Sequence, residues 1–540
     1  MMNLTHRLTG LICVALIALQ PTVALAGSAY AVSGKRGPFI DQVAARKINV
    51  AGGQGARGLV DDAINQGANQ TARLRMPQTE AKITALLQRI EASWPYPKGA
   101  PLQVLIQGVD YYSAYSLPDG SIVVGFGLLD RAQSDDEVAF VLAHELSHVR
   151  LGHFANDAAK KRRHDTAGRL GQLYVLASLA GGARNLSGGR QGAAVFAGRA
   201  TTAGRRAEAT SDLLHFFNNA MIEPAWAQGE EDEADALGFD LSLKVPFAAE
   251  AASARVFDTI QADEARRRQL RASLEGRLKR EMGRTATDSV IKSALDSGGS
   301  RQEFKRGLVG SAGRMAMGAA THSDGSAEHR PPEDRKRGLG AYSAAAYRDL
   351  ALRDEATTWI SDLRATQEFT DARIAVAAVS AAKTARADGD LAGAETEIAK
   401  ADPTMFKDSP LVLNEAGRLR GDQGDTAGAD VLFNRAHAST DQTIDGYVDH
   451  VRMFYETGQG LNGFLVAKAG EDRFGDEKPF LALKIAIARQ AKRKKEMNVF
   501  LKRCMKVDDE SLQQDCQLAA GKSPEPKRRR GIQVMGVGLG

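Results

Sequence analysis

The sequence has few cysteines, little excess charge and, beyond residue 26, no apolar run long enough to span a bilayer. A formal net charge of +5 over 540 residues is too small to indicate nucleic-acid binding, and no recognition motif accompanies it. Hydrophobic residues make up 43% and charged residues 25%, so the depletion typical of disordered chains is absent. The length allows two or three domains.

Residues 1–26 have the pattern of a cleavable secretory signal. Arg7 supplies a positive charge, Leu11 to Leu19 an apolar run, and Ala24-Leu25-Ala26 a small-residue cleavage site. A retained membrane anchor is the alternative, but Gln20-Pro21 interrupts the run well short of the length that spans a bilayer. We therefore expect export, which in a bacterium means the periplasm.

The cysteines agree with export. Beyond residue 26 the sequence contains only Cys504 and Cys516. An even pair in an oxidising compartment favours a disulfide that closes a short loop. Two buried free thiols are the alternative.

A histidine pair predicts a metal site. His144 and His148 are four residues apart, so on a helix they share a face and both imidazoles can reach one ion. Zinc accepts neutral imidazoles, and a catalytic zinc site combines three protein ligands with one open position for water. Glu145 is placed to act as general base toward that water. Ser134 and the acidic residues after it predict a capped helix start.

The third ligand does not follow from common spacings. A histidine six residues after His148 would be at position 154, which is Phe154, and no glutamate follows about twenty residues downstream. The next donors lie in the acidic run that contains Glu231 and Asp235, which are four apart. On a helix, one can bind the metal while the other accepts a hydrogen bond from a ligand histidine. An acidic, solvated helix start is the alternative reading.

These two motifs together resemble the prenyl-protein-endopeptidase-like zinc metallopeptidases, metallopeptidase family forty-eight. The family signature, HExxH followed by ExxAD, is matched at His144, Glu145, His148, Glu231 and Asp235 within about residues 75–365. The resemblance implies one Zn²⁺ held by the two histidines and Glu231, with Asp235 orienting a ligand histidine. The lack of later membrane spans differs from the multipass members and argues against a prenyl-protein substrate.

A second stretch resembles the periplasmic relatives. A histidine that precedes prolines, with an arginine six residues later, matches His329 and Arg335, although Arg330 intervenes and His322 is a rival. The resemblance implies that His329 approaches the zinc, either to stabilise the oxyanion or to occupy the open position in a latent state. A surface histidine is the alternative.

The pattern predicts an α+β fold, mostly helical with a small sheet, of the zincin type. We expect a lead-in segment at 27–75, a peptidase domain at 76–365, a helix at 78–93 and strands at 102–107 and 121–126. The second strand either lines the cleft, where an extended peptide adds to its edge, or is an ordinary core strand. The insertion 156–225, with its basic run at 160–164, is either a lid that touches a membrane surface or a solvated loop.

A repeat follows the peptidase domain. The heptapeptide that starts at Gly389 recurs at Gly424 and, more weakly, at Gly458, in steps of 35 and 34 residues. Each glycine is predicted to turn the chain between two helices, and the small residue four positions on to allow their close packing. The segment 366–521 resembles tetratricopeptide repeats, which stack into a curved array; an unrelated bundle is the alternative. Residues 522–540 form a basic tail that we expect to be disordered.

We therefore expect an exported zinc metalloendopeptidase that cleaves polypeptides. The resemblance implies misfolded or misassembled envelope proteins as substrates, and an envelope complex docked on the repeats. The alternative is a periplasmic chaperone or assembly adaptor, which acts through its repeats while the zinc site stays latent.

Overall fold

The computed structural model describes residues 30–43, 72–98, 101–117, 120–153, 228–245, 247–297, 330–350 and 359–522. The predictions for residues 1–26, for the insertion 156–225, for His322 and His329 and for the tail beyond residue 522 fall outside this part of the chain. Within it, no helix combines the length and apolar character needed to cross a bilayer.

A three-stranded sheet confirms the α+β class. The strands β1 (Gln103–Gln107), β2 (Ala114–Ser116) and β3 (Ser121–Gly125) lie in the order β1-β3-β2. β1 pairs with β3 in parallel, and β2 pairs with β3 as an antiparallel hairpin. β3, the strand proposed to line the cleft, is central and fully buried, and β1 and β2 are the two outer strands. The two predicted strands are confirmed, and β3 is the ordinary core strand.

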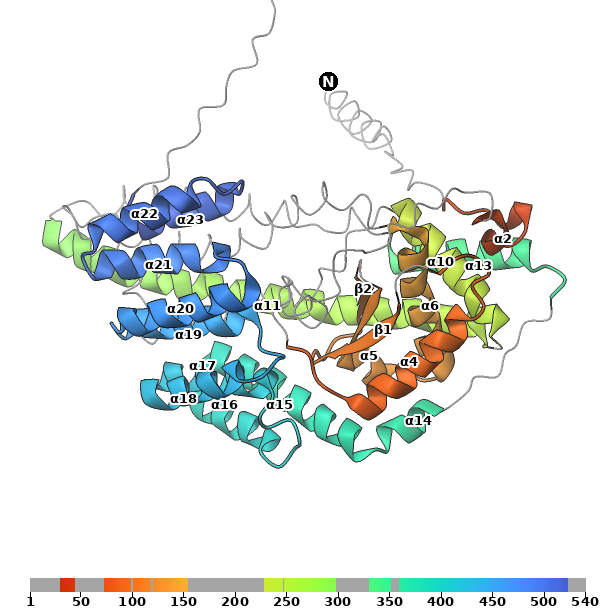
Figure 1. The fold of residues 1–540 in the computed structure, drawn as a ribbon, viewed down its shortest axis with the longest axis horizontal. Helices are drawn as coiled ribbons and strands as arrows, with labels where there is room; N and C mark the ends of the chain where they lie inside the picture. Colours follow the sequence, from red (N-terminus) through yellow and green to blue (C-terminus); the bar gives the residue numbers. More distant parts are fainter. Residues whose placement is uncertain are drawn as a thin grey trace, which may run out of the picture.

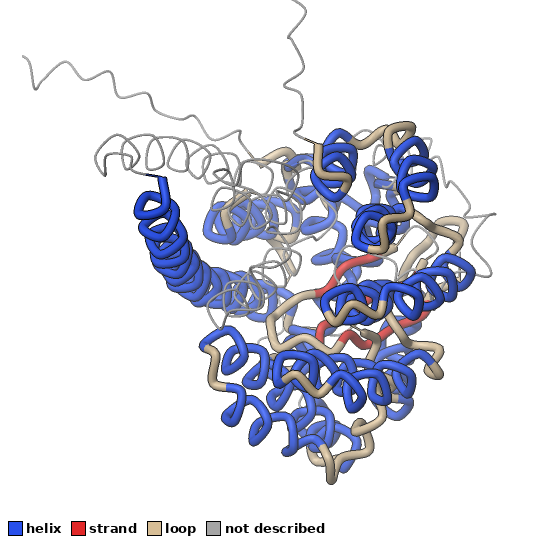
Figure 2. Tube along the Cα trace, turned by 90° about the vertical axis from the view of Figure 1, so that its left-hand side faces the viewer, coloured by secondary structure: helices blue, strands red, loops and turns tan. Residues whose placement is uncertain are grey.

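Helices surround this sheet (Figures 1 and 2). The predicted first helix is α4 (Pro77–Glu91), and its apolar stripe is buried, at Ile83, Leu86, Leu87 and Ile90. The other helices of this part of the molecule are α5 (Phe126–Arg131), α6 (Asp135–Leu151), α10 (Gln228–Lys244), α11 (Ala249–Ser297) and α13 (Pro332–Ala346). α6 packs directly against α10 and α11, and α13 packs against α10 and α11.

Part of the expected lead-in segment packs into the core. It forms a 3-10 turn, η1 (Gly34–Arg36), and a short helix, α2 (Phe39–Val43). The amide of Phe39 donates to the Tyr342 hydroxyl, and that of Ile40 donates to Asp240, at 2.7 and 2.8 Å. A five-residue helix is too short to show periodicity, so this packing gave no sequence signal.

The C-terminal part is helical throughout. After α14 (Trp359–Arg364) the helices pack as consecutive pairs: α15 (Gln367–Asp388) with α16 (Leu391–Ile398), α17 (Pro410–Gln423) with α18 (Thr426–His437), α19 (Ile444–Glu456) with α20 (Gly460–Phe474), and α21 (Lys478–Gln490) with α22 (Lys494–Cys504). A 3-10 turn, η5 (Ala399–Ala401), follows α16, and α23 (Glu510–Ala519) packs on α21 and α22. Cys504 and Cys516 form the predicted disulfide.

The repeated glycines turn the chain as predicted. Gly389, Gly424 and Gly458 have φ of 77°, 84° and 74°, which glycine adopts without strain. The glycine four positions on has a different role from the predicted one. At Gly393, the atoms nearest to an added Cβ belong to Asp390, whose carboxylate accepts from the Gly393 amide at 2.8 Å. This small residue leaves room for the aspartate that caps the next helix.

The first helix pair packs directly on the part of the molecule that contains the sheet. Phe369 of α15 contacts Phe126 of α5, with ring centroids 4.8 Å apart. The Glu368 carboxylate accepts hydrogen bonds from the Thr79 amide and hydroxyl at 2.9 and 2.8 Å, at the start of α4. Both phenylalanines belong to one apolar cluster that extends from residue 32 to residue 419. The position of α4 is therefore tied to the first helix pair.

Candidate metal centre

The helix α6 carries the HExxH residues in the core. Its start is capped as predicted: the Ser134 hydroxyl accepts from the Glu137 amide at 3.3 Å, and the Glu137 carboxylate accepts from the Gln133 amide. His144, Glu145 and His148 are all at most 9% exposed. The helix ends at Leu151, where Gly152 adopts φ 69° and its amide caps the His148 carbonyl.

The helix α10 supplies the carboxylates. It lies against α6 at Gly238, where an added Cβ would be 2.9 Å from the backbone nitrogen of His144. Any side chain larger than glycine would push the two helices apart. This close approach brings Glu231 and Asp235, which are both buried, to the histidines.

Three donors converge on one point between the helices. His144 Nε2 lies 3.1 Å from His148 Nε2, and Glu231 carboxylate oxygens lie 3.6 and 3.9 Å from these two nitrogens. Ligands of a tetrahedral zinc ion, bound at about 2.0–2.2 Å, are separated by about 3.3–3.6 Å. The three residues therefore fit a metal ion, and among the described residues they form the group able to hold one.

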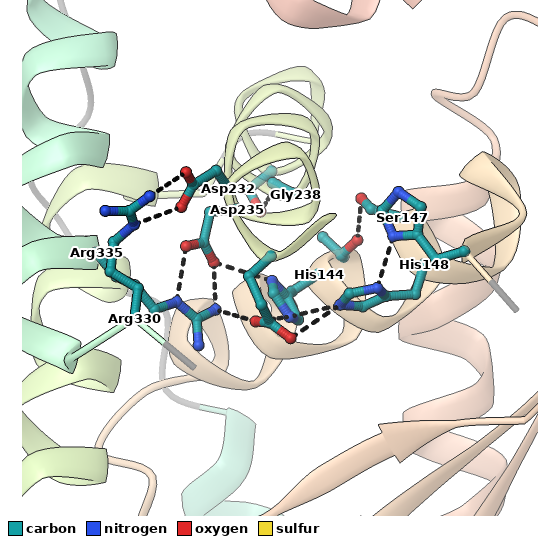
Figure 3. A network of polar contacts seen from close by, with 12 residues as sticks. His144, Ser147, His148, Asp232, Asp235, Gly238, Arg330 and Arg335 are labelled. Carbon is teal, nitrogen blue, oxygen red and sulfur yellow. Dashed lines mark hydrogen bonds and ion pairs between the residues drawn. The ribbon is translucent and has the colours of Figure 1, made fainter. Parts of the chain in front are cut away.

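Asp235 determines the orientation of the first histidine. Its carboxylate lies 3.0 Å from Nδ1 of His144, on the side of the ring away from His148 (Figure 3). A proton on Nδ1 satisfies this contact and leaves Nε2 as the lone pair that faces the other donors. Burial lowers the pKa of His144, but the hydrogen bond and charge of Asp235 and the charge of Glu231 outweigh it, so this pKa is raised.

Arg335 of α13 holds both carboxylates. Its guanidinium donates to the two oxygens of Asp235 at 2.8 and 2.6 Å and lies 3.1 Å from Glu231. Burial raises the pKa of Asp235, yet the charge and hydrogen bonds of Arg335, together with His144, bring it down to about 2. Asp235 is therefore ionised at any physiological pH. The sequence pattern had singled out Arg335, but without these partners.

A second buried ion pair, Arg330–Asp232, involves the same two parts of the chain as the Arg335–Asp235 pair. Arg330 donates to both oxygens of Asp232 at 3.0 and 2.9 Å, and the same carboxylate accepts from the Ala31 amide at 2.7 Å. The Tyr30 hydroxyl donates to the Asp232 carbonyl. Sequence analysis missed Asp232, because nothing in a run of acidic residues marks which member faces inward. Its carboxylate joins the N-terminal segment to the helix that carries Glu231.

The structure thus brings together four of the motif residues, namely His144, His148, Glu231 and Asp235. Figure 3 shows His144 between Asp235 and His148. Glu145 follows the first of these histidines on α6 and is 6% exposed. His329 lies outside the described residues, directly before Arg330 in the sequence.

Comparison with known proteins agrees with this geometry. The chain is similar to "Mitochondrial metalloendopeptidase OMA1" of Arabidopsis thaliana, with 36% identity over 72 residues, and the match covers 13% of this chain and 15% of the relative. The chain thus matches only a small part of that protein's length. The model of peptidase family M48 matches residues 77–283, which contain both motifs. Residues 77–283, which carry the three converging donors, are therefore similar to peptidase family M48.

Proposed function

We propose that this protein is a zinc-dependent endopeptidase that hydrolyses peptide bonds within polypeptide substrates. The observation that carries the proposal is the convergence of His144, His148 and Glu231 from two helices, although 83 positions of the sequence separate His148 from Glu231 (231 − 148). Two imidazoles and one carboxylate are the ligand set typical of zinc peptidases, in which a fourth position is left for water.

The residues around the ligands supply the remaining chemistry. Zinc, when bound, polarises the scissile carbonyl and lowers the pKa of a bound water. Glu145 accepts the proton of the attacking water and delivers it to the leaving amine. Asp235, held by Arg335, keeps the His144 ring in the orientation and tautomer that binding requires.

The sheet offers a way to bind extended chains. β2 is one of the two outer strands of the sheet in the described part of the chain, and it packs against α6, the helix that carries the histidines. An extended substrate that pairs with an edge strand is held by main-chain hydrogen bonds, largely independent of its sequence. This mode suits an enzyme that cleaves many unfolded proteins.

The location and substrates form the finer part of the proposal. Residues 1–26 have the composition of a secretory signal, and the Cys504–Cys516 disulfide suits an oxidising compartment. The helix pairs from α15 to α22 suit a tetratricopeptide-like array, which presents proteins to the cleft or docks on an envelope complex. We therefore propose misfolded or misassembled envelope proteins as substrates.

A comparison of the wild-type chain with Glu145→Gln tests the activity. Both proteins, loaded with zinc, are incubated with casein, and cleavage is followed beside protection of a second protein from aggregation. We expect the variant to keep its zinc and to lose cleavage by about 10²–10⁴-fold, the usual contribution of a general base. Absence of cleavage by the wild type, with equal protection by both proteins, would instead identify a chaperone or adaptor.

A further inference from the structure

The end of α6 folds a third histidine back onto the site. After Leu151 the left-handed Gly152 reverses the chain, and its amide donates to the His148 carbonyl. The next residue, His153, is thereby placed over the last turn of the helix and is only 6% exposed. Its ring meets the His148 ring edge to face, with centroids 4.9 Å apart. The sequence spacing excludes His153 from the usual third-ligand position, and the structure places it elsewhere.

His153 lies behind the second ligand histidine. Nδ1 of His153 is 2.8 Å from Nδ1 of His148, whereas Nε2 of His148 lies 3.1 Å from Nε2 of His144. The two ring nitrogens of His148 therefore point to opposite sides, one toward the donor group and one toward His153. His153 cannot bind the same ion as Nε2 of His148, but it can fix the orientation of the His148 ring through Nδ1.

The hydrogen bond defines the protonation of both rings. A neutral imidazole that binds a cation through Nε2 carries its proton on Nδ1, so His148 must donate to Nδ1 of His153. His153 accepts this bond only as the tautomer with its proton on Nε2. That nitrogen lies 3.6 Å from the Glu233 carboxylate of α10, which favours this tautomer.

We propose that His153 and Glu233 are positioning residues for the ligand His148, as Asp235 and Arg335 are for His144. This inference rests on the proposed metal site and deepens it. Both ligand histidines of α6 are then oriented from α10, the first by Asp235 directly and the second by Glu233 through His153. Loss of such an orienting partner typically lowers metal affinity by 10–100-fold.

Two substitutions at one position separate this role from simple packing. His153→Leu removes the acceptor, whereas His153→Asn places an amide oxygen close to the position of Nδ1. We expect the zinc dissociation constant, measured by competition with a chelator, to rise 10–100-fold in His153→Leu and to rise much less in His153→Asn. Long-range ¹H–¹⁵N spectra of histidine-labelled, zinc-loaded protein should show the Nδ1-protonated form of His148 in the wild type and in His153→Asn.

Substitution of Glu233 tests the contact between its carboxylate and His153. Glu233→Gln should weaken zinc binding less than His153→Leu does, and Glu250→Gln, an exposed glutamate of α11, should leave it unchanged. The Glu233 side chain is 25% exposed and glutamine matches its size, so we expect Glu233→Gln to fold and to remain informative if His153→Leu unfolds.

The outcomes distinguish this inference from the proposed function. A wild-type protein that binds no zinc overturns both. A wild-type protein that binds zinc, with unchanged affinity in His153→Leu and in Glu233→Gln, overturns the inference alone. Equal losses in His153→Leu and His153→Asn also overturn it, because packing rather than an acceptor would then explain the effect.

Discussion

At the scale of single residues, the site depends on buried charges that neutralise one another. Asp235 and Glu231 would be costly to bury alone, and the Arg335 guanidinium compensates both. The same arginine keeps Asp235 ionised, so the carboxylate can accept the Nδ1 proton of His144. Arg335 thus stabilises the fold and orients a ligand through one set of contacts.

Removal of this arginine should destabilise the protein strongly. Arg335→Ala leaves Asp235 buried without its main partner, so we expect a loss of about 3–5 kcal/mol in the free energy of unfolding. Denaturant unfolding in the presence of a chelator measures this loss without any metal contribution. Arg337→Ala, on the same helix but with a side chain that is 76% exposed, should cost less than about 1 kcal/mol. Equal losses in both variants would show that the Arg335 pair is not a buried ion pair.

At the scale of secondary-structure elements, the distance between α6 and α10 determines whether the donors converge. Gly238 allows the approach, because an added Cβ would be 2.9 Å from the backbone nitrogen of His144 and 3.1 Å from its Cα. Backbone atoms cannot rotate away as a flexible side chain can. A larger residue must therefore move a whole helix, and Glu231 moves with it.

Substitution at this contact should weaken both stability and metal binding. For Gly238→Ala we expect a loss of about 1–3 kcal/mol in unfolding free energy from overpacking, with weaker zinc binding. Gly340→Ala is the matched control: it is also helical, but an added Cβ there meets no atom within 4 Å. The control should be neutral or stabilising by up to about 1 kcal/mol. If Gly238→Ala bound zinc as tightly as the wild type, this result would contradict the proposed role of the distance between α6 and α10.

One carboxylate, Asp240, should make the stability of the protein depend on pH. It lies where α2, α10 and α13 meet. Asp240 accepts hydrogen bonds from the hydroxyls of Tyr342 and Tyr347 and from the Ile40 amide, at 2.6, 2.7 and 2.8 Å. Burial nevertheless dominates and raises the pKa of Asp240 from 3.8 to about 6. Folding therefore takes up a proton between these two values. The contribution of this group to stability is complete below about pH 4 and is lost as the pH rises through about 6.

The variant Asp240→Asn isolates this term, because asparagine does not titrate in this range. As the pH rises from 4 to 7, the stability of the wild type relative to the variant should fall by roughly 2–4 kcal/mol. Urea unfolding of both proteins at several pH values measures the difference. A difference that stays constant with pH, or that grows in favour of the wild type, would contradict the raised pKa.

Some of these elements could be predicted from the sequence, and others could not. The histidine spacing, the Ser134 cap and the apolar stripe of α4 are local signals, and the structure agrees with them. β2 has only three residues, too few for an alternating pattern, and whether β3 lies at an edge depends on pairing that spacing does not encode. The Asp232–Arg330 pair joins residues 98 positions apart and leaves no local trace.

At the scale of the whole molecule, the part that contains the sheet and the C-terminal helix pairs are packed together. Glu368 caps the start of α4, and the Arg364 guanidinium donates to the Leu129 carbonyl at the end of α5. Two more contacts join the residues just before α4 to the C-terminal helix pairs. The Arg75 guanidinium lies 2.6 Å from the Asp441 carboxylate and donates to the Thr440 hydroxyl at 2.9 Å. The helix pairs therefore contact the part of the chain that carries the metal-binding residues, and their sequence period did not indicate this contact.

The last pairs of helices form a separate apolar cluster. It extends from Ile444 to Ala519 and includes Cys504 and Cys516, whose disulfide links α22 to α23. The only sequence signals for this disulfide were the even number of cysteines and the expected export. Which buried groups surround the two sulfurs depends on how the helices stack, which periodicity does not specify.

The central claim is that two distant helices hold one metal ion, and the zinc content of the purified chain tests it most directly. Elemental analysis of the wild type and of Glu231→Gln, after dialysis against buffer with trace zinc, should give about one zinc per wild-type chain and a marked loss in the variant, because the glutamine carbonyl is a weaker ligand than the carboxylate. Glu250→Gln, the exposed control on α11, should retain the wild-type content. One zinc per chain in Glu231→Gln, held as tightly as in the wild type, would contradict the claim.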